Sequence, residues 1–185
     1  IDDEQKLELK FDFVDDIKLI NWDKKEVLVQ VSVTINEGKD DDIFELITTK
    51  NDDLVSVKLN TDNWKNQWSQ GDCYQTSEIN YVVYFPSGME LEAKSISGNF
   101  TLSTLSMHAS VKTISGDIDL TVPAGLDFRA KTISGEVFSD LNIEYPNGKE
   151  GLHQLVGMNV EGKVKSGSAR QNLETISGNI YLRKG

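Results

Sequence analysis

The chain has 185 residues, 38% of them hydrophobic, and this length suits a single domain with a sizeable core. Its net charge of −11 argues against nucleic acid and anionic membrane surfaces as partners. The single cysteine, Cys73, excludes an internal disulfide and a cysteine-based metal site. No stretch approaches the ~18 apolar residues of a membrane span. The sequence begins at Ile1 rather than at Met, as expected of a processed, exported protein.

The first 85 residues contain several segments in which apolar and polar residues alternate, and each is expected to form a β-strand. Residues 13–19 can be aligned with the repeat described below, with Asp15 in the place of a glycine, so we interpret them as a decayed first coil. The other strands expected here are 27–35, a hairpin formed by 43–48 and 54–59, and 79–85. Pro86 marks the turn that ends this N-terminal β section.

Residues 61–77 have no periodicity, but they carry three aromatic side chains, Trp64, Trp68 and Tyr74. Because the open ends of a repeat fold need a cover, we expect this segment and the N-terminal strands to cap one end. The alternative is a ligand loop in which Trp64, Trp68 and Tyr74 stack on a sugar.

A phrase of the form Thr-Ile-Ser-Gly, with Ser in place of Thr in its first copy, recurs in the second half of the chain. Its isoleucines are Ile96, Ile114, Ile133 and Ile176, separated by 18, 19 and 43 residues (114 − 96, 133 − 114 and 176 − 133). The last interval suits two units, with residues 160–164 as a decayed copy around Gly162. Apolar and polar residues alternate around the copies, which indicates repeated strands rather than helices.

This pattern predicts an all-β fold, a parallel β-solenoid (single-stranded β-helix or roll) in which each repeat forms one coil. We expect the isoleucine, valine and leucine columns to be buried between coils, and the crossovers to be right-handed. Residues 1–185 are predicted to form one domain, with 1–85 as the N-terminal section and cap and 86–185 as the regular coils. A glycine at each corner would permit a positive φ or a close neighbouring backbone. The predicted corner glycines are Gly98, Gly116, Gly135, Gly162 and Gly178.

A longer phrase, Pro-x-Gly-x-x-x-x-Ala-Lys, begins at Pro86 and again at Pro123. The copies that follow include Thr-Ile-Ser-Gly-Asp-Ile-Asp-Leu at 113–120 and Thr-Ile-Ser-Gly-Asn-Ile-Tyr-Leu at 175–182. These phrases resemble the bacterial putative-adhesin β-solenoid family, a domain-of-unknown-function family of exported and surface proteins. The resemblance is specific over residues 86–182, and the family offers no catalytic residue to carry over.

Two carboxylates are the strongest candidates for chemistry. Asp117 and Glu136 hold the same outward position in copies that are adjacent in the sequence, so they are expected ~5 Å apart. That separation would fit a retaining glycosidase pair or part of a Ca²⁺ site. The favoured interpretation is a ladder of solvated turn residues, continued by Asn99 and Asn179.

The remaining polar residues indicate no catalytic or metal site. Lys94, Lys112 and Lys131 precede their isoleucines by two residues and form either a basic strip for an anionic polymer or, as we favour, a solubilising face. The two histidines, His108 and His153, are paired with no nucleophile in the sequence. We therefore expect no catalytic residue, no metal and no cofactor.

These observations favour a non-enzymatic, exported protein of the bacterial cell envelope, adhesin-like or scaffold, with an envelope or glycan ligand. A lipid anchor upstream of Ile1 would fit this interpretation. The alternatives are a carbohydrate-binding or carbohydrate-cleaving module and a sensor domain for envelope stress or antimicrobial compounds. Because only residues 183–185 follow the last coil, we expect that coil to remain open or to mediate self-association.

Overall fold

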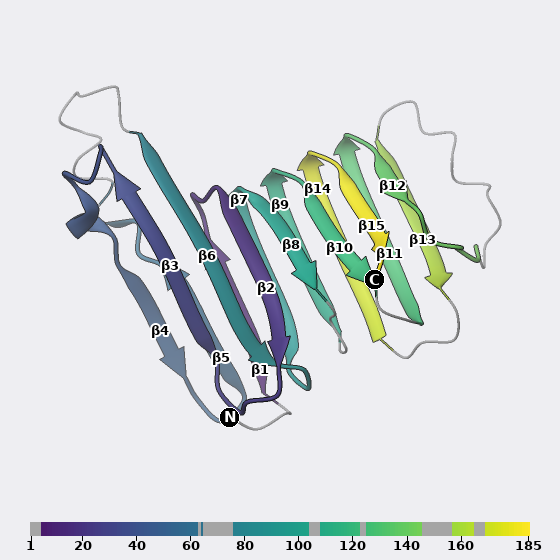
Figure 1. Ribbon diagram of the computed structural model, residues 1–185, viewed down its shortest axis with the longest axis horizontal. Helices are drawn as coiled ribbons and strands as arrows, with labels where there is room; N and C mark the ends of the chain where they lie inside the picture. The colour runs from purple at the N-terminus through teal and green to yellow at the C-terminus, as the bar shows by residue number, and fades with distance from the viewer. Residues whose placement is uncertain are drawn as a thin grey trace.

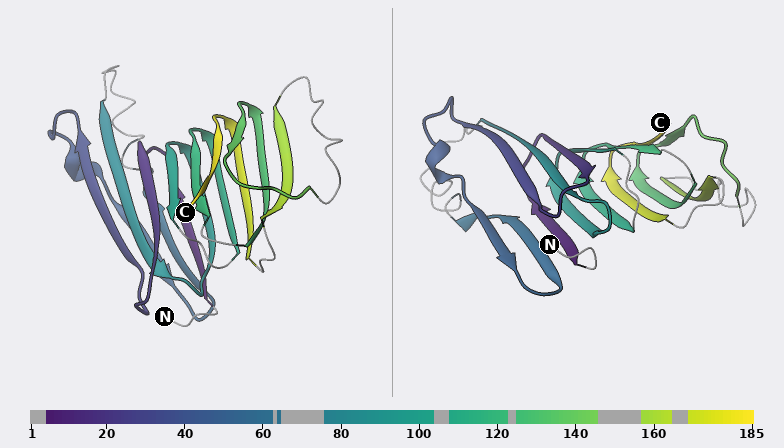
Figure 2. Two further views of the ribbon diagram at one scale, coloured as in Figure 1. Left: turned by 45° about the vertical axis from the view of Figure 1, so that its right-hand side comes forward. Right: turned by 60° about the horizontal axis from the view of Figure 1, so that its bottom comes forward.

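The computed structural model describes residues 5–62, 64, 76–103, 108–122, 125–145, 157–164 and 169–185. The described residues form two β-sheets, which lie face to face with the apolar core between them (Figures 1 and 2). The helical residues among them are the short 3₁₀ helix η1 (Asp41–Ile43) and Asp62 and Trp64. The all-β prediction is therefore confirmed.

The first sheet has eight strands. In spatial order they are β13 (Met158–Val164), β11 (Leu126–Ser134), β14 (Ala169–Ser177), β9 (Ala109–Ser115), β7 (Glu90–Ser97), β1 (Lys6–Phe11), β5 (Leu54–Leu59) and β4 (Leu46–Lys50). The second sheet has seven strands. They are β12 (Val137–Ser139), β15 (Ile180–Lys184), β10 (Ile118–Val122), β8 (Asn99–Ser103), β2 (Asp16–Trp22), β6 (Ser77–Pro86) and β3 (Leu28–Ile35).

Each repeat contributes one strand to each sheet and so forms a coil. The spatial order of the coils is β1/β2, β7/β8, β9/β10, β14/β15 and β11/β12. The C-terminal coil β14/β15 thus lies between two earlier coils, as Figure 1 shows. Both of its edges are paired, since β14 bonds to β9 and β11 while β15 bonds to β10 and β12. The expectation that this coil forms an open end is wrong.

The decayed first coil predicted in residues 13–19 is present. Ile17 lies opposite Phe100, and Leu19 lies opposite Leu102, in the parallel pairing of β2 with β8. The predicted hairpin also forms, as the antiparallel pair β4 and β5. The strand expected over residues 27–35 is β3, which runs antiparallel to β6.

A purely parallel solenoid is not confirmed. Adjacent coils pair in parallel, but β3, β4 and β13 pair antiparallel with their neighbours, so both sheets are mixed. The predicted corner at Gly162 is also wrong, because Gly162 lies inside β13 opposite Phe128. The segment around it pairs antiparallel with β11 at the edge of the first sheet and does not form a further coil.

The core consists of columns of inward side chains that repeat from coil to coil. In the second sheet, Ile17, Phe100, Ile118 and Ile180 form one such column, and each is at most 1% exposed. In the first sheet, the last inward residue before each corner is a serine or a threonine and not the isoleucine that follows it. These residues are Ser95, Thr113, Thr175 and Thr132. This arrangement follows from strict alternation along β11, in which Ala130 and Thr132 point inward and Ile133 points outward.

Trp64 packs against the first coil, at the turn between β1 and β2. Its side chain is only 4% exposed, and its ring stacks on that of Phe13 with 6.1 Å between centroids. Trp64 therefore packs as part of the core and offers no open ring face to a sugar. Trp68, Cys73, Tyr74 and His153 lie outside the described residues.

Candidate binding surface

The four isoleucines of the repeated phrase are on the surface. The repeat pattern predicts them in the core, but Ile96, Ile114, Ile176 and Ile133 are 41%, 48%, 45% and 47% exposed. The pairing register places them side by side in this order, on β7, β9, β14 and β11. We call this line of side chains the isoleucine row. Neighbouring members are one strand spacing, ~4.8 Å, apart, so the row is a continuous apolar stripe.

The residue before each isoleucine explains why the isoleucine points outward. Thr113, Thr175 and Thr132 are at most 4% exposed, and each hydroxyl donates a hydrogen bond to a glycine carbonyl of the neighbouring coil. The acceptors are Gly98, Gly116 and Gly178, at 3.4, 3.0 and 2.8 Å. The buried hydroxyls are thereby satisfied, and alternation then directs the isoleucines to solvent.

The glycines after the isoleucines allow the coils to approach closely at this corner. A Cβ at Gly116 would lie 2.1 Å from the carbonyl oxygen of Gly98, and one at Gly178 would lie 2.0 Å from that of Gly116. At Gly135 the corresponding distance, to the carbonyl oxygen of Gly178, is 1.9 Å. Gly98 also has a φ of +117°, which L side chains rarely adopt. Four stacked glycines therefore keep the isoleucine row straight and closely spaced.

A ladder of polar side chains borders the isoleucine row on one side. The amide oxygen of Asn99 accepts from the backbone N–H of Asp117 at 3.1 Å, and the Asp117 carboxylate accepts from the N–H of Asn179 at 2.7 Å. Asn179 in turn accepts from the N–H of Glu136 at 3.0 Å. This set of four residues, three places after each isoleucine, is the acidic border.

The acidic border corrects the expected carboxylate pair. Asp117 and Glu136 are not on adjacent coils, because the C-terminal coil places Asn179 between them. Two strand spacings are ~10 Å, whereas a retaining glycosidase needs its two carboxyl groups ~5–5.5 Å apart. The Asp117 carboxylate, moreover, accepts a backbone hydrogen bond within the ladder.

The other border consists of residues two places before each isoleucine, which are Lys94, Lys112, Glu174 and Lys131 in spatial order. We call this set the basic border. Glu174 interrupts the expected strip of lysines and forms an ion pair of 3.0 Å with Lys112. Burial acts to raise the pKa of Glu174, but Lys112, Asn172 and Lys131 together outweigh it, and the pKa lies below its usual value. The interruption argues against a continuous basic track for an anionic polymer.

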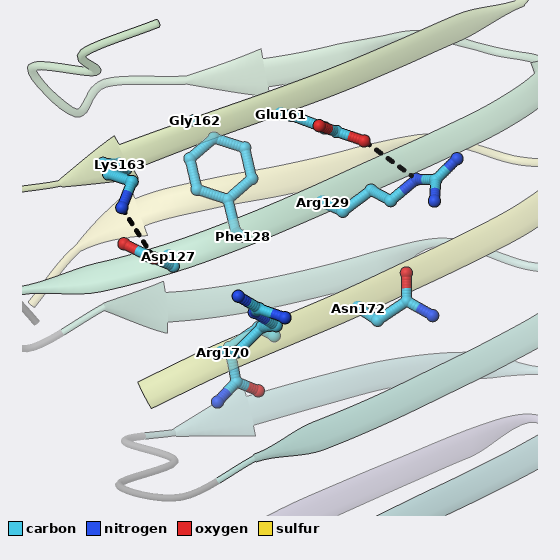
Figure 3. Close-up of a pocket in the computed structure, with 9 residues that line it drawn as sticks. Asp127, Phe128, Arg129, Glu161, Gly162, Lys163, Arg170 and Asn172 are labelled. Atoms are coloured by element: carbon cyan, nitrogen blue, oxygen red, sulfur yellow. Dashed lines mark ion pairs between the residues drawn. The ribbon is translucent and has the colours of Figure 1, made fainter. Parts of the chain in front are cut away.

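A pocket of about 450 Å³ lies away from the row, on β11, β13 and β14 (Figure 3). Three consecutive residues of each strand line it, namely 127–129, 161–163 and 170–172. Its carboxylates are paired across the strands, Asp127 with Lys163 at 3.0 Å and Glu161 with Arg129 at 3.4 Å (Figure 3). These paired charges do not form the closely spaced carboxylate pair of a glycosidase.

The outer face of the second sheet carries an aromatic pair that the sequence analysis missed. The rings of Phe138 and Tyr181 stack with 5.3 Å between centroids, and Phe138 is 45% exposed. Arg183 lies over the Tyr181 ring and donates to the Asp119 carboxylate at 2.7 Å. Phe138 and Tyr181 both stand five residues after an isoleucine of the phrase, so the repeat alignment could have found them.

Within the described ranges, no three His, Cys, Asp or Glu side chains are grouped in a way that could hold a metal ion. His108 accepts a hydrogen bond from the backbone N–H of Arg170 at 3.2 Å. The helical residues that the structure describes include no segment long and apolar enough to cross a membrane.

The fold and the repeated phrase define an all-β repeat protein that exposes a row of four isoleucines. The chain belongs to the Toastrack DUF4097 family, whose model matches residues 86–183, just over half of the sequence. The family resemblance inferred from the repeated phrases is thus confirmed. No curated protein matches the chain in sequence.

One solved structure shares the fold over nearly the whole chain. It is a crystal structure of a putative cell adhesion protein from Clostridium sporogenes ATCC 15579, with a TM-score of 0.56 and 14% sequence identity. The alignment covers 98% of this chain and 93% of that one. At this identity the likeness shows a common fold, which includes the N-terminal strands outside the family match.

Proposed function

We propose that this protein is a non-enzymatic, exported module of the bacterial cell envelope that attaches to other proteins through the isoleucine row. The single observation that carries the proposal is the exposure of four isoleucines, each 41–48%, in one unbroken line. Soluble proteins rarely leave a contiguous apolar stripe in water unless it contacts a partner. The fold shared with a putative cell adhesion protein supports the adhesive character of that contact.

The construction of the row supports a binding role over a purely structural one. Threonine, a poorer core residue, fills the inward position, while isoleucine is placed outside. The reverse order would bury more apolar area and would remove the exposed stripe. Isoleucine thus occupies the exposed position in all four copies of the phrase.

The proposal is tested by displaying the chain on a non-adherent bacterium and measuring attachment to other cells and to coated surfaces. The parent chain should increase attachment, and the double variant Ile114→Ser/Ile176→Ser should abolish the increase. The matched control is Leu28→Ser/Ile47→Ser, which removes two side chains of similar exposure, 40% and 47%, far from the row. Equal attachment by both variants would refute the isoleucine row as the contact surface, and no attachment by the parent would refute the adhesive function.

A second candidate function is glycan binding by the aromatic pair Phe138 and Tyr181. Exposed aromatic rings beside charged hydrogen-bonding groups are suited to stacking on sugars, and Arg183 and Asp119 lie next to this pair. A glycan array should then detect the parent chain, with loss of the signal in Phe138→Ala/Tyr181→Ala. Binding that survives this variant would exclude the pair as a sugar platform.

A further inference from the structure

We infer that the partner of the isoleucine row is a second copy of this chain, held in a two-fold contact whose axis runs parallel to the row. The inference rests on the proposed function of the row as a contact surface. It follows from the charges on the two borders, which are opposite in two of the four coils and alike in none.

The borders carry opposite charges at two of the four levels of the stack. In the coil of Ile114, the basic border has Lys112 and the acidic border has Asp117. In the coil of Ile133 the two residues are Lys131 and Glu136. The coils whose acidic border is neutral carry Asn99 opposite Lys94 and Asn179 opposite Glu174. No coil has the same charge on both borders.

A two-fold axis parallel to the row would pair every opposite charge on the two borders. It would set each isoleucine against the same isoleucine of the other copy, and would set each border over the opposite border. Lys112 would then face Asp117 of the second copy, and Lys131 would face Glu136 of the second copy. An axis perpendicular to the row would instead reverse the coil order. It would place Lys112 opposite Glu174, but it would leave Asp117 and Glu136 opposite asparagines and would place Lys94 opposite Lys131. That like-charge contact disfavours the alternative.

The size of the surface points to a reversible contact. A stable interface buries ~800 Å² on each partner, which four half-exposed isoleucines do not supply alone. The contact must therefore include both borders, and their lysines are long enough to cover the edges of the apolar stripe. We expect association that depends on concentration and weakens with added salt.

The test is sedimentation of the purified chain over a range of concentrations up to about 1 mM, where contacts worth ~4 kcal/mol are half formed. The parent should self-associate, Ile114→Ser/Ile176→Ser should remain monomeric, and Leu28→Ser/Ile47→Ser should associate like the parent. Lys131→Glu and Glu136→Lys should each weaken association by at least about tenfold, because each creates like-charge contacts across the axis. Thermal melting of each variant checks that it is folded.

Mixing the two charge variants is the decisive step. In a mixed pair, the glutamate introduced at position 131 of one chain would face the lysine introduced at position 136 of the other. The unchanged Lys131 of the second chain would face the unchanged Glu136 of the first. Association should therefore return to the parent level in the mixture, although each variant alone associates at least about tenfold more weakly.

Each part of this test can overturn the inference. A parent that stays monomeric, a row variant that still associates, or a mixture that fails to recover would each do so. Adhesion lost in the row variant of a strictly monomeric parent would overturn the two-fold contact while leaving the proposed function intact.

Discussion

Replacing Gly178 by alanine should test the packing of the coils more severely than any other single change. Gly178 lies in the middle of the glycine stack, where neither neighbouring coil can move away freely. A Cβ there would lie 2.0 Å from the carbonyl oxygen of Gly116, and ordinary van der Waals contact begins at 3.4 Å. The shortfall is 1.4 Å (3.4 − 2.0), so β14/β15 must separate from β9/β10 at this corner.

Four hydrogen bonds hold these two coils together at that corner. They are Gly116 N–H to Ser177 O (3.2 Å), Ile118 N–H to Asn179 O (2.9 Å), Asn179 N–H to the Asp117 carboxylate (2.7 Å) and the Thr175 hydroxyl to Gly116 O (3.0 Å). At ~1 kcal/mol each, losing three or four of them costs about 3–4 kcal/mol. For a chain of this length that loss lowers the melting temperature by about 10 °C.

The matched control is Gly38→Ala, which separates backbone conformation from close approach. Gly38 has a φ of +84°, but a Cβ there would meet only a carboxylate oxygen of Asp41 at 3.7 Å. Its cost is therefore conformational strain of about 1–2 kcal/mol. Both variants are compared with the parent by calorimetry. A Gly178→Ala protein that melts no lower than Gly38→Ala would refute the close packing of the coils.

Two further changes test the hydrogen bonds and ion pairs of the first sheet. Thr175→Val should lower the free energy of unfolding in urea by about 1–3 kcal/mol, because it leaves the Gly116 carbonyl without the threonine hydroxyl as its donor. The control is Thr121→Val on the partly exposed face of β10, which should be nearly neutral. Lys6 and Lys94 lower the pKa of Glu92 from 4.5 to about 2, so Glu92 stabilises the fold above pH ~4.5 and this contribution is lost as the pH falls towards 2. Glu92→Gln should accordingly cost up to about 1 kcal/mol at pH 7 and nothing below pH 2, since partly exposed pairs are screened. Glu90→Gln, on the same strand, is the control, and an equal loss in both variants or a loss that does not change with pH would contradict this assignment.

The repeat pattern predicted the strands well but misjudged which side chains the corner buries. Alternation identified the inward columns of Phe100, Ile118 and Ile180, and even the decayed coil around Ile17. It failed at the phrase itself, where hydrophobicity favoured isoleucine as the core residue. The hydroxyl of threonine reverses that preference, because a glycine carbonyl of the next coil lies within hydrogen-bond distance. That acceptor belongs to another coil, so the residues next to the threonine in the sequence do not predict it.

The order of the coils could not be predicted for a related reason. Each copy of the phrase presents the same threonine, isoleucine and glycine to both neighbours, so the copies can pair with one another in more than one order. Proximity in the sequence suggested that the coils of Ile114 and Ile133 are adjacent. In the structure β14 lies between β11 and β9, so the C-terminal coil separates the coils of Ile133 and Ile114. The false pairing of Asp117 with Glu136 came from that one assumption.

The order of the coils is also the claim on which the isoleucine row depends, and disulfide trapping measures it directly. With Cys73 replaced by serine, Ser115→Cys/Ser177→Cys joins positions that the register places opposite each other on neighbouring strands. Their Cα atoms should be ~4.8 Å apart, within the roughly 4.4–6.8 Å that a disulfide spans. Ser115→Cys/Ser134→Cys joins positions separated by the C-terminal coil, beyond the limit of ~7 Å. The structure predicts a bond in the first pair, detected by mass spectrometry after mild oxidation, and none in the second. A bond in the second pair and not in the first would show that the coils follow chain order and that the isoleucine row is assembled differently.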